Sequence, residues 1–110
     1  MTPRLIACDV DGTLLPAGQP ELSDETVALI KRIVEAGIVF VPASGRQLTG
    51  LRKVFAPVGC VDAFVAEDGS VSCVAGEFVG AVAIDRDLGD ELVRAVLAKP
   101  ECELDRKRHV

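Results

Sequence analysis

Two aspartates separated by one residue follow the first apolar stretch of the chain. Residues 5–8 are apolar, and Asp9 and Asp11 come immediately after them. A buried strand normally avoids such a pair, because an unpaired charge is expensive to remove from water. At the carboxyl end of a strand, however, the pair can face a crevice and bind a hard cation such as Mg2+, which prefers oxygen ligands. We therefore predict that Asp9 and Asp11 bind a metal ion beside a phosphate group.

The residue types at this position suit phosphoryl transfer to a carboxylate. This chemistry needs an in-line nucleophile, neutralisation of charge on the phosphate oxygens, and an acid for the leaving group. Asp9 is the candidate nucleophile, and Asp11 can exchange a proton with the ester oxygen. Gly12 permits a tight turn that presents backbone N–H groups to the phosphate, and the Thr13 hydroxyl can brace that turn.

Alone, an aspartate pair of this kind is more often a surface turn, so a second group of residues matters. Ser44, Gly45 and Arg46 follow another apolar stretch, residues 38–41. Because adjacent parallel strands end at the same edge of a sheet, we expect Ser44 and Gly45 to bind a phosphate oxygen beside Asp9. A helix beginning just after Arg46 would add its N-terminal dipole. Arg46 itself suits a structural salt bridge and a substrate contact equally.

The elements that must position these residues alternate between strand and helix. Ser23 is a good N-cap for a helix that Gly37 ends, and Pro57 stops a second, shorter helix. The expected strands are residues 5–10, 38–41 and 63–66. This β-α-β-α-β order implies right-handed crossovers and a parallel sheet.

The pattern changes after the third strand. The Asp68-Gly69 pair predicts a hairpin into residues 71–74. A further strand over residues 77–84 and an amphipathic helix ending near Lys99 are expected beyond it. We place a boundary between two units near residue 75, with the charged tail from residue 101 as a solvated end.

Composition restricts the partners. The chain has 110 residues, the length of one small domain, with 49% hydrophobic and 26% charged residues. Its net charge of -5 argues against a nucleic-acid partner. The four cysteines show no metal-ligand spacing, and Cys8 suits a buried thiol. With no apolar stretch long enough for a bilayer and no pattern typical of a secretory signal, we expect a cytoplasmic protein without a membrane partner.

Two segments carry a resemblance to a known family. They are D-V-D-G-T-L-L at residues 9–15 and A-S-G-R at residues 43–46. Together they resemble the first two motifs of the haloacid dehalogenase-like hydrolases, and within them the Cof-like and sugar-phosphatase group. The resemblance implies an α/β fold with a parallel, Rossmann-like sheet, truncated here, and the start of an α/β cap.

The resemblance also implies roles for the motif residues. The side chain of Asp9 would form an aspartyl-phosphate, and Asp11 would be the general acid and base. Mg2+ would bind the Asp9 side chain and the Asp11 backbone carbonyl, and the Ser44 hydroxyl would hold phosphate. The E-D-G turn at residues 67–69 resembles the E-N-G turn of the group, with Asp68 in place of the usual Asn.

The resemblance divides the chain at the same place as the change in pattern. Residues 1–75 would be the N-terminal part of the core, and residues 76–110 the start of the cap and the charged tail. A later Lys motif and a later acidic motif of the family have no counterpart in this sequence. We therefore expect an N-terminal fragment or a naturally shortened relative, poorly active by itself. Its first strand would be an exposed edge open to self-association.

The leading hypothesis is thus a Mg2+-dependent phosphatase that hydrolyses a small phosphorylated metabolite such as a sugar phosphate. The alternative is a non-catalytic phosphate- or metal-binding module, or an inactive fragment that works with another chain. A nucleotide-binding kinase is disfavoured, because the chain has no phosphate-binding G-x-x-x-x-G-K-[ST] sequence. Phosphomutase chemistry uses the same motifs and is not distinguished from hydrolysis by this sequence.

Overall fold

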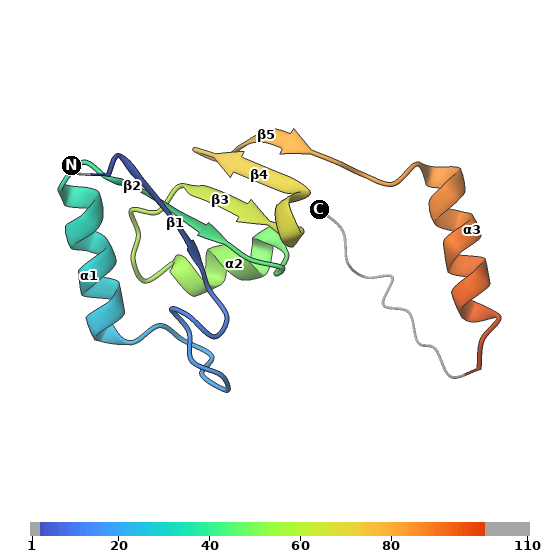
Figure 1. Cartoon of the computed structure of the whole chain (residues 1–110), viewed down its shortest axis with the longest axis horizontal. Helices are drawn as coiled ribbons and strands as arrows, with labels where there is room; N and C mark the ends of the chain where they lie inside the picture. The colour runs from blue at the N-terminus through green and yellow to red at the C-terminus, as the bar shows by residue number, and fades with distance from the viewer. Residues whose placement is uncertain (1–2, 101–110) are drawn as a thin grey trace.

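A five-stranded sheet organises the chain (Figure 1). The computed structural model describes residues 3–100. The strands lie in sequence order, and the first three pair in parallel while the last two pair antiparallel. Their bounds are β1 (Leu5–Asp9), β2 (Val39–Ala43), β3 (Ala63–Ala66), β4 (Val71–Val74) and β5 (Glu77–Ala81). The predicted α/β class with a parallel sheet is confirmed for β1 to β3, and the hairpin makes the sheet mixed.

Helices connect the parallel strands, as the periodicity predicted. These are α1 (Asp24–Glu35) and α2 (Leu48–Phe55); α3 (Arg86–Leu97) follows β5, and a short 3-10 turn, η1 (Glu67–Gly69), joins β3 to β4. The N-cap of α1 is Ser23, whose hydroxyl oxygen accepts a hydrogen bond of 3.1 Å from the backbone N–H of Thr26. Gly37 follows α1 with a φ of 83°, a left-handed conformation that favours glycine.

Three phenylalanines hold α2 against the sheet. The ring of Phe55 on α2 lies 6.2 Å from that of Phe40 on β2 and 6.3 Å from that of Phe64 on β3. These are favourable separations for aromatic pairs. The same buried cluster contains Ile30 of α1 and Leu15 after β1, so both connecting helices share one core. The core thereby fixes the loop at residues 44–47 between β2 and α2.

The register of the parallel strands sets which residues meet at their carboxyl edge. Asp9 on β1 is opposite Ala43 on β2, and Ala43 is opposite Val65 on β3. The residues that follow these three strands therefore gather along one edge of the sheet. This edge is where the sequence predicted that the two motifs would meet.

Several element bounds differ from the sequence prediction. β2 runs to Ala43 rather than stopping at residue 41, and it includes Pro42. Proline lacks an N–H donor and is usually confined to strand ends, edges or bulges, so the pattern gave no reason to continue the strand through it. β5 ends at Ala81 and not at residue 84, and α3 ends at Leu97.

The segment from β5 to α3 is the most exposed part of the described chain. β5 pairs with β4, yet each of its residues is exposed, and α3 stands away from the sheet in Figure 1. Its exposed apolar side chains are Phe78, Val79, Val82, Ile84, Leu88, Leu92 and Leu97.

The division into residues 1–75 and 76–110 stays a prediction, and the tail at residues 101–110 lies outside the described residues. Across residues 3–100, no helix has both the length and the apolar character needed to cross a bilayer.

Within residues 3–100, β1 forms one edge of the sheet, and Leu5 on it is 54% exposed. An apolar edge strand is a template for pairing with another chain, and an edge lysine opposes such pairing. We therefore expect Leu5→Lys to reduce self-association of the 110-residue chain, measured as the concentration dependence of its mass in sedimentation. Leu29→Lys on α1 is the matched control, since Leu29 is 52% exposed and lies off the edge. Equal reductions in both variants would contradict pairing through β1.

Candidate active site

The turn after β1 holds the first aspartate in a defined orientation. Asp9 ends β1, and its Oδ2 accepts a hydrogen bond of 2.9 Å from the Thr13 hydroxyl. The Gly12 N–H closes the turn by donating to the Leu15 carbonyl at 2.8 Å. Val10, which is fully buried, packs the turn into the hydrophobic core. Gly12 has a φ of 81°, which a residue with a side chain rarely adopts. The tight turn at Gly12 and its bracing by Thr13 are thus present. The N–H groups of Gly12 and Thr13, however, donate to the Leu15 and Val10 carbonyls within the turn, so their presentation to a phosphate stays a prediction.

Ser44 connects the two motifs. It is buried, and its N–H donates to the Val65 carbonyl at 2.9 Å, which attaches the end of β2 to β3. Its hydroxyl oxygen accepts from the Arg46 N–H at 3.1 Å, and its hydroxyl donates to Asp11 Oδ2 at 3.3 Å. One hydroxyl therefore joins the loop after β2 to the turn after β1.

Arg46 forms an ion pair with Asp11. Its Nε lies 3.1 Å and 3.0 Å from the two carboxylate oxygens, and its Nη2 lies 2.7 Å from Oδ1. The hydrogen bonds from Arg46 lower the pKa of Asp11, and the same hydrogen bonds raise the pKa of Arg46. The two side chains are 37% and 52% exposed, so the pair stabilises the fold little. Its effect is on the position and charge of Asp11.

A cavity of about 300 Å³ lies at this edge of the sheet. Residues of β1, β2 and β3, the loop after β2 and the η1 turn line it: Asp9, Ala43, Ser44, Gly45, Val65, Asp68 and Gly69. The structure therefore brings three of the four predicted site residues, Asp9, Ser44 and Gly45, to one cavity. The fourth, Asp11, is held at Ser44 by a hydrogen bond, with its carboxylate directed to Arg46.

The η1 turn adds Asp68, which the sequence analysis placed in a hairpin signal and in a turn that resembles the E-N-G turn of the family, but not among the site residues. The backbone N–H of Asp68 donates to the Ser44 carbonyl at 3.2 Å, and that of Glu67 donates to the Arg46 carbonyl at 2.9 Å. The Asp68 carboxylate lies against Gly45 so closely that a Cβ atom there would be 3.0 Å from its Oδ1. The available signal was its position directly after the third parallel strand, at the edge shared with both motifs.

The donor set for a divalent cation is the right type but small. Asp9 offers a carboxylate and Asp11 a backbone carbonyl, both hard oxygen donors of the kind that Mg2+ prefers. Among residues 3–100, no cluster of three or more His, Cys, Asp or Glu side chains could enclose a metal ion. These residues therefore fit a partial magnesium shell, to be completed by phosphate, water or other ligands.

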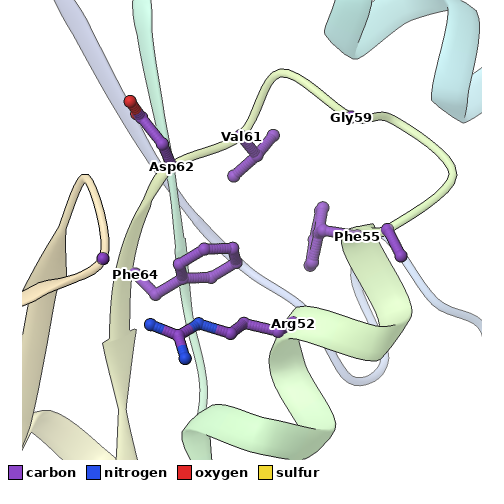
Figure 2. A pocket seen from close by; sticks show the side chains of 8 residues that line it. Arg52, Phe55, Gly59, Val61, Asp62 and Phe64 are labelled. Carbon is purple, nitrogen blue, oxygen red and sulfur yellow. The ribbon is translucent and has the colours of Figure 1, made fainter.

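A second cavity, of about 560 Å³, lies near the start of β3 (Figure 2). Figure 2 shows the Arg52 side chain extending beside the Phe64 ring, while the Asp62 carboxylate points away. The guanidinium of Arg52 donates to the buried Cys73 sulfur at 3.2 Å. None of the predicted site residues lines this cavity, so it is separate from the chemistry at the carboxyl edge.

An aspartate that ends β1, a second two residues later and a serine directly after β2 thus meet at one edge of a parallel α/β fold. Residues 6–104 match the sequence profile of the haloacid dehalogenase-like hydrolases, and the chain belongs to that family. The prediction drawn from the two motifs is confirmed.

Individual relatives agree with the family. The chain is 33% identical over 104 residues to the 5-amino-6-(5-phospho-D-ribitylamino)uracil phosphatase YbjI of Escherichia coli, covering 94% of this chain and 38% of that protein. A crystal structure from Eubacterium rectale is 33% identical with a TM-score of 0.75, over 86% of this chain and 36% of that one. A haloacid dehalogenase-like hydrolase from B. subtilis is 25% identical with a TM-score of 0.74, over 86% and 33%. The chain thus spans about two-fifths of the length of the curated relative it matches.

The ion pair predicts a measurable titration. Because hydrogen bonds from Arg46 lower the pKa of Asp11, Arg46→Gln should raise that pKa toward its ordinary value. The stabilisation that Asp11 gains from the pair is present above its unfolded pKa and is lost as the pH falls through its folded pKa. Carbon-13 NMR of the Asp11 carboxyl group across acidic pH measures the midpoint directly. Arg52→Gln serves as the control, since Arg52 contacts Cys73 instead; an unchanged midpoint in Arg46→Gln would contradict the ion pair.

Proposed function

We propose that the complete protein is a Mg2+-dependent phosphatase that works through an aspartyl-phosphate on Asp9. The observation that carries this proposal is the shared cavity, which brings Asp9 together with Ser44 and Gly45. Family membership and the phosphatase among its relatives support the same reaction class. This chain covers only 38% of the length of that relative, so the activity and the residue roles below are proposed for the whole protein.

The substrate we propose is a small phosphorylated metabolite with a sugar or polyol character. The name of the E. coli relative describes a phosphate on a ribityl chain, which is a linear polyol. The site is also consistent with a compact ester, since a cavity of about 300 Å³ is at the small end of ligand pockets. A cytoplasmic location, as expected from the sequence, belongs to the same proposal.

In this mechanism Asp9 attacks the phosphorus atom. The Thr13 hydroxyl holds Oδ2 at 2.9 Å and thereby orients the carboxylate for attack by its other oxygen. A P–O bond forms to Asp9 while the ester P–O bond breaks, and water later hydrolyses the acyl phosphate. Ser44 would turn its hydroxyl proton from Asp11 to a phosphate oxygen, and Gly45 would contribute its backbone N–H.

Asp11 would move the protons. Its neutral form donates to the leaving oxygen, and its ionised form then accepts a proton from the attacking water. The ion pair with Arg46 favours the ionised form, which suits the second half of the cycle. For the first half, Arg46 has to loosen its hold on Asp11, and a bound phosphate is the group that would compete for the guanidinium.

Asp9 and the Asp11 carbonyl would hold Mg2+. When bound, the cation would offset negative charge on the phosphate oxygens and on Asp9. The cation would transfer no proton and form no bond to the leaving group; those steps involve only the protein, the ester and water.

The nucleophile assignment predicts a complete loss of turnover. Asp9→Asn keeps the shape of the side chain but removes the nucleophilic carboxylate, so phosphatase activity should fall to background while thermal unfolding changes little. Hydrolysis of a generic phosphate ester by the complete protein, with Mg2+ present, is the measurement. Asp62→Asn is the matched control, because Asp62 lines the cavity near the start of β3. Substantial turnover by Asp9→Asn would overturn the assignment.

The acid role of Asp11 predicts a dependence on the leaving group. Asp11→Asn should slow hydrolysis of an alkyl phosphate by about a hundredfold or more, the usual size of a lost proton transfer. An activated aryl phosphate should lose much less, because its leaving group needs little protonation. Comparing kcat for both esters tests the role, and equal losses would count against it.

A further inference from the structure

Asp68 has a fixed position in the candidate active site. Its backbone N–H donates to the Ser44 carbonyl, and its carboxylate packs against Gly45. Both the serine and the glycine line the cavity with Asp9. Any ligand held by Ser44 and Gly45 therefore lies next to the Asp68 carboxylate.

The conformation of the turn does not require a charge at this position. Asp68 has φ 55° and ψ 34°, in the left-handed region that both aspartate and asparagine tolerate. Within residues 3–100, no hydrogen-bond donor reaches the Asp68 carboxylate, and the side chain is exposed. An asparagine side chain of the same shape would serve the fold equally. The main difference is therefore the negative charge that aspartate places at the cavity.

A carboxylate in this place acts on a ligand in two ways. It accepts hydrogen bonds and donates none, so it favours hydroxyl groups on the organic part of a phosphate ester. It also repels a second anionic group, because like charges a few ångströms apart in a partly solvated cavity disfavour each other strongly. Arg46 is paired with Asp11 in this structure and, under the proposed function, would turn to the bound phosphate, so in neither state is Asp68 its partner.

We propose that Asp68 is a specificity-determining residue that selects phosphate esters with a neutral, hydroxyl-bearing organic part and excludes esters with a second anionic group near the phosphate. The inference rests on the proposed phosphatase function and deepens it by defining the substrate class. It assigns to Asp68 a role in choosing the substrate and no role in the chemical step.

Two esters of nearly equal size test whether Asp68 disfavours a second anionic group, a selection that we call the charge filter. Glycerol 3-phosphate and 3-phosphoglycerate differ in that a hydroxymethyl group of the first is a carboxylate in the second. The complete wild-type protein should have the higher kcat/KM for glycerol 3-phosphate. In Asp68→Asn, kcat/KM for 3-phosphoglycerate relative to glycerol 3-phosphate should rise about tenfold, the order expected for one lost like-charge contact. Asp62→Asn removes the same charge from the cavity near the start of β3 and should leave this ratio unchanged.

The outcomes separate this inference from the proposed function. A purely structural role for Asp68 would change kcat/KM for both esters equally, and an unchanged ratio in active Asp68→Asn protein would overturn the filter. If neither ester is hydrolysed in a manner that depends on Asp9, the proposed function fails. The filter is then tested by the dissociation constants of both esters, followed by NMR at the Gly45 amide. A ratio of these constants that Asp68→Asn does not shift would also overturn it.

Discussion

The register of β1 against β2 is the constraint on which the rest of the site depends. Asp9 lies opposite Ala43, so the residue that ends β1 and the residue before Ser44 are side by side. A slip of one residue would turn the side chains of β1 to the other face of the sheet, which the buried cluster opposes. The same packing that stabilises the core therefore aligns the two motifs, although they are more than thirty residues apart.

Three short loops then form the site by bonding to one another. Ser44 contacts Asp11 through its hydroxyl and Val65 through its N–H, and the η1 turn donates to the Ser44 and Arg46 carbonyls. Loops at the end of a sheet are usually the more mobile parts of a fold, but backbone hydrogen bonds between these loops limit that freedom. A site arranged in this way is ordered before a ligand arrives, which reduces the cost of binding one.

The sequence was sufficient where the signals are local. Ser23 caps α1, residues 63–66 form β3, and the turn after them leads into β4, because caps, apolar runs and turn residues act over a few positions. The partner of Arg46 could not be predicted in this way. A guanidinium beside the site suits a carboxylate of the protein or a phosphate equally, and only the direction of the side chain distinguishes the two. The contact of Asp68 with Gly45 was missed for a related reason, since neither the hairpin signal nor the family resemblance of residues 67–69 indicated it.

The charged side chains at the cavity determine how a phosphate ester and a cation affect each other's binding. Asp9 and Asp68 both line the cavity, and Arg46 already offsets Asp11. A phosphate dianion placed at Ser44 therefore meets the carboxylates of Asp9 and Asp68, and the guanidinium of Arg46, shared with Asp11, offsets only part of that repulsion unless a cation is also present. Under the proposed function, a cation on the Asp9 side reduces the repulsion at one carboxylate only. The charge of Asp68, on the β3 side, is not offset by the cation and acts on the organic part of the ester. Phosphate and cation consequently assist each other's binding by the same free energy, as linkage requires, while the choice among esters depends on the carboxylate that the cation does not neutralise.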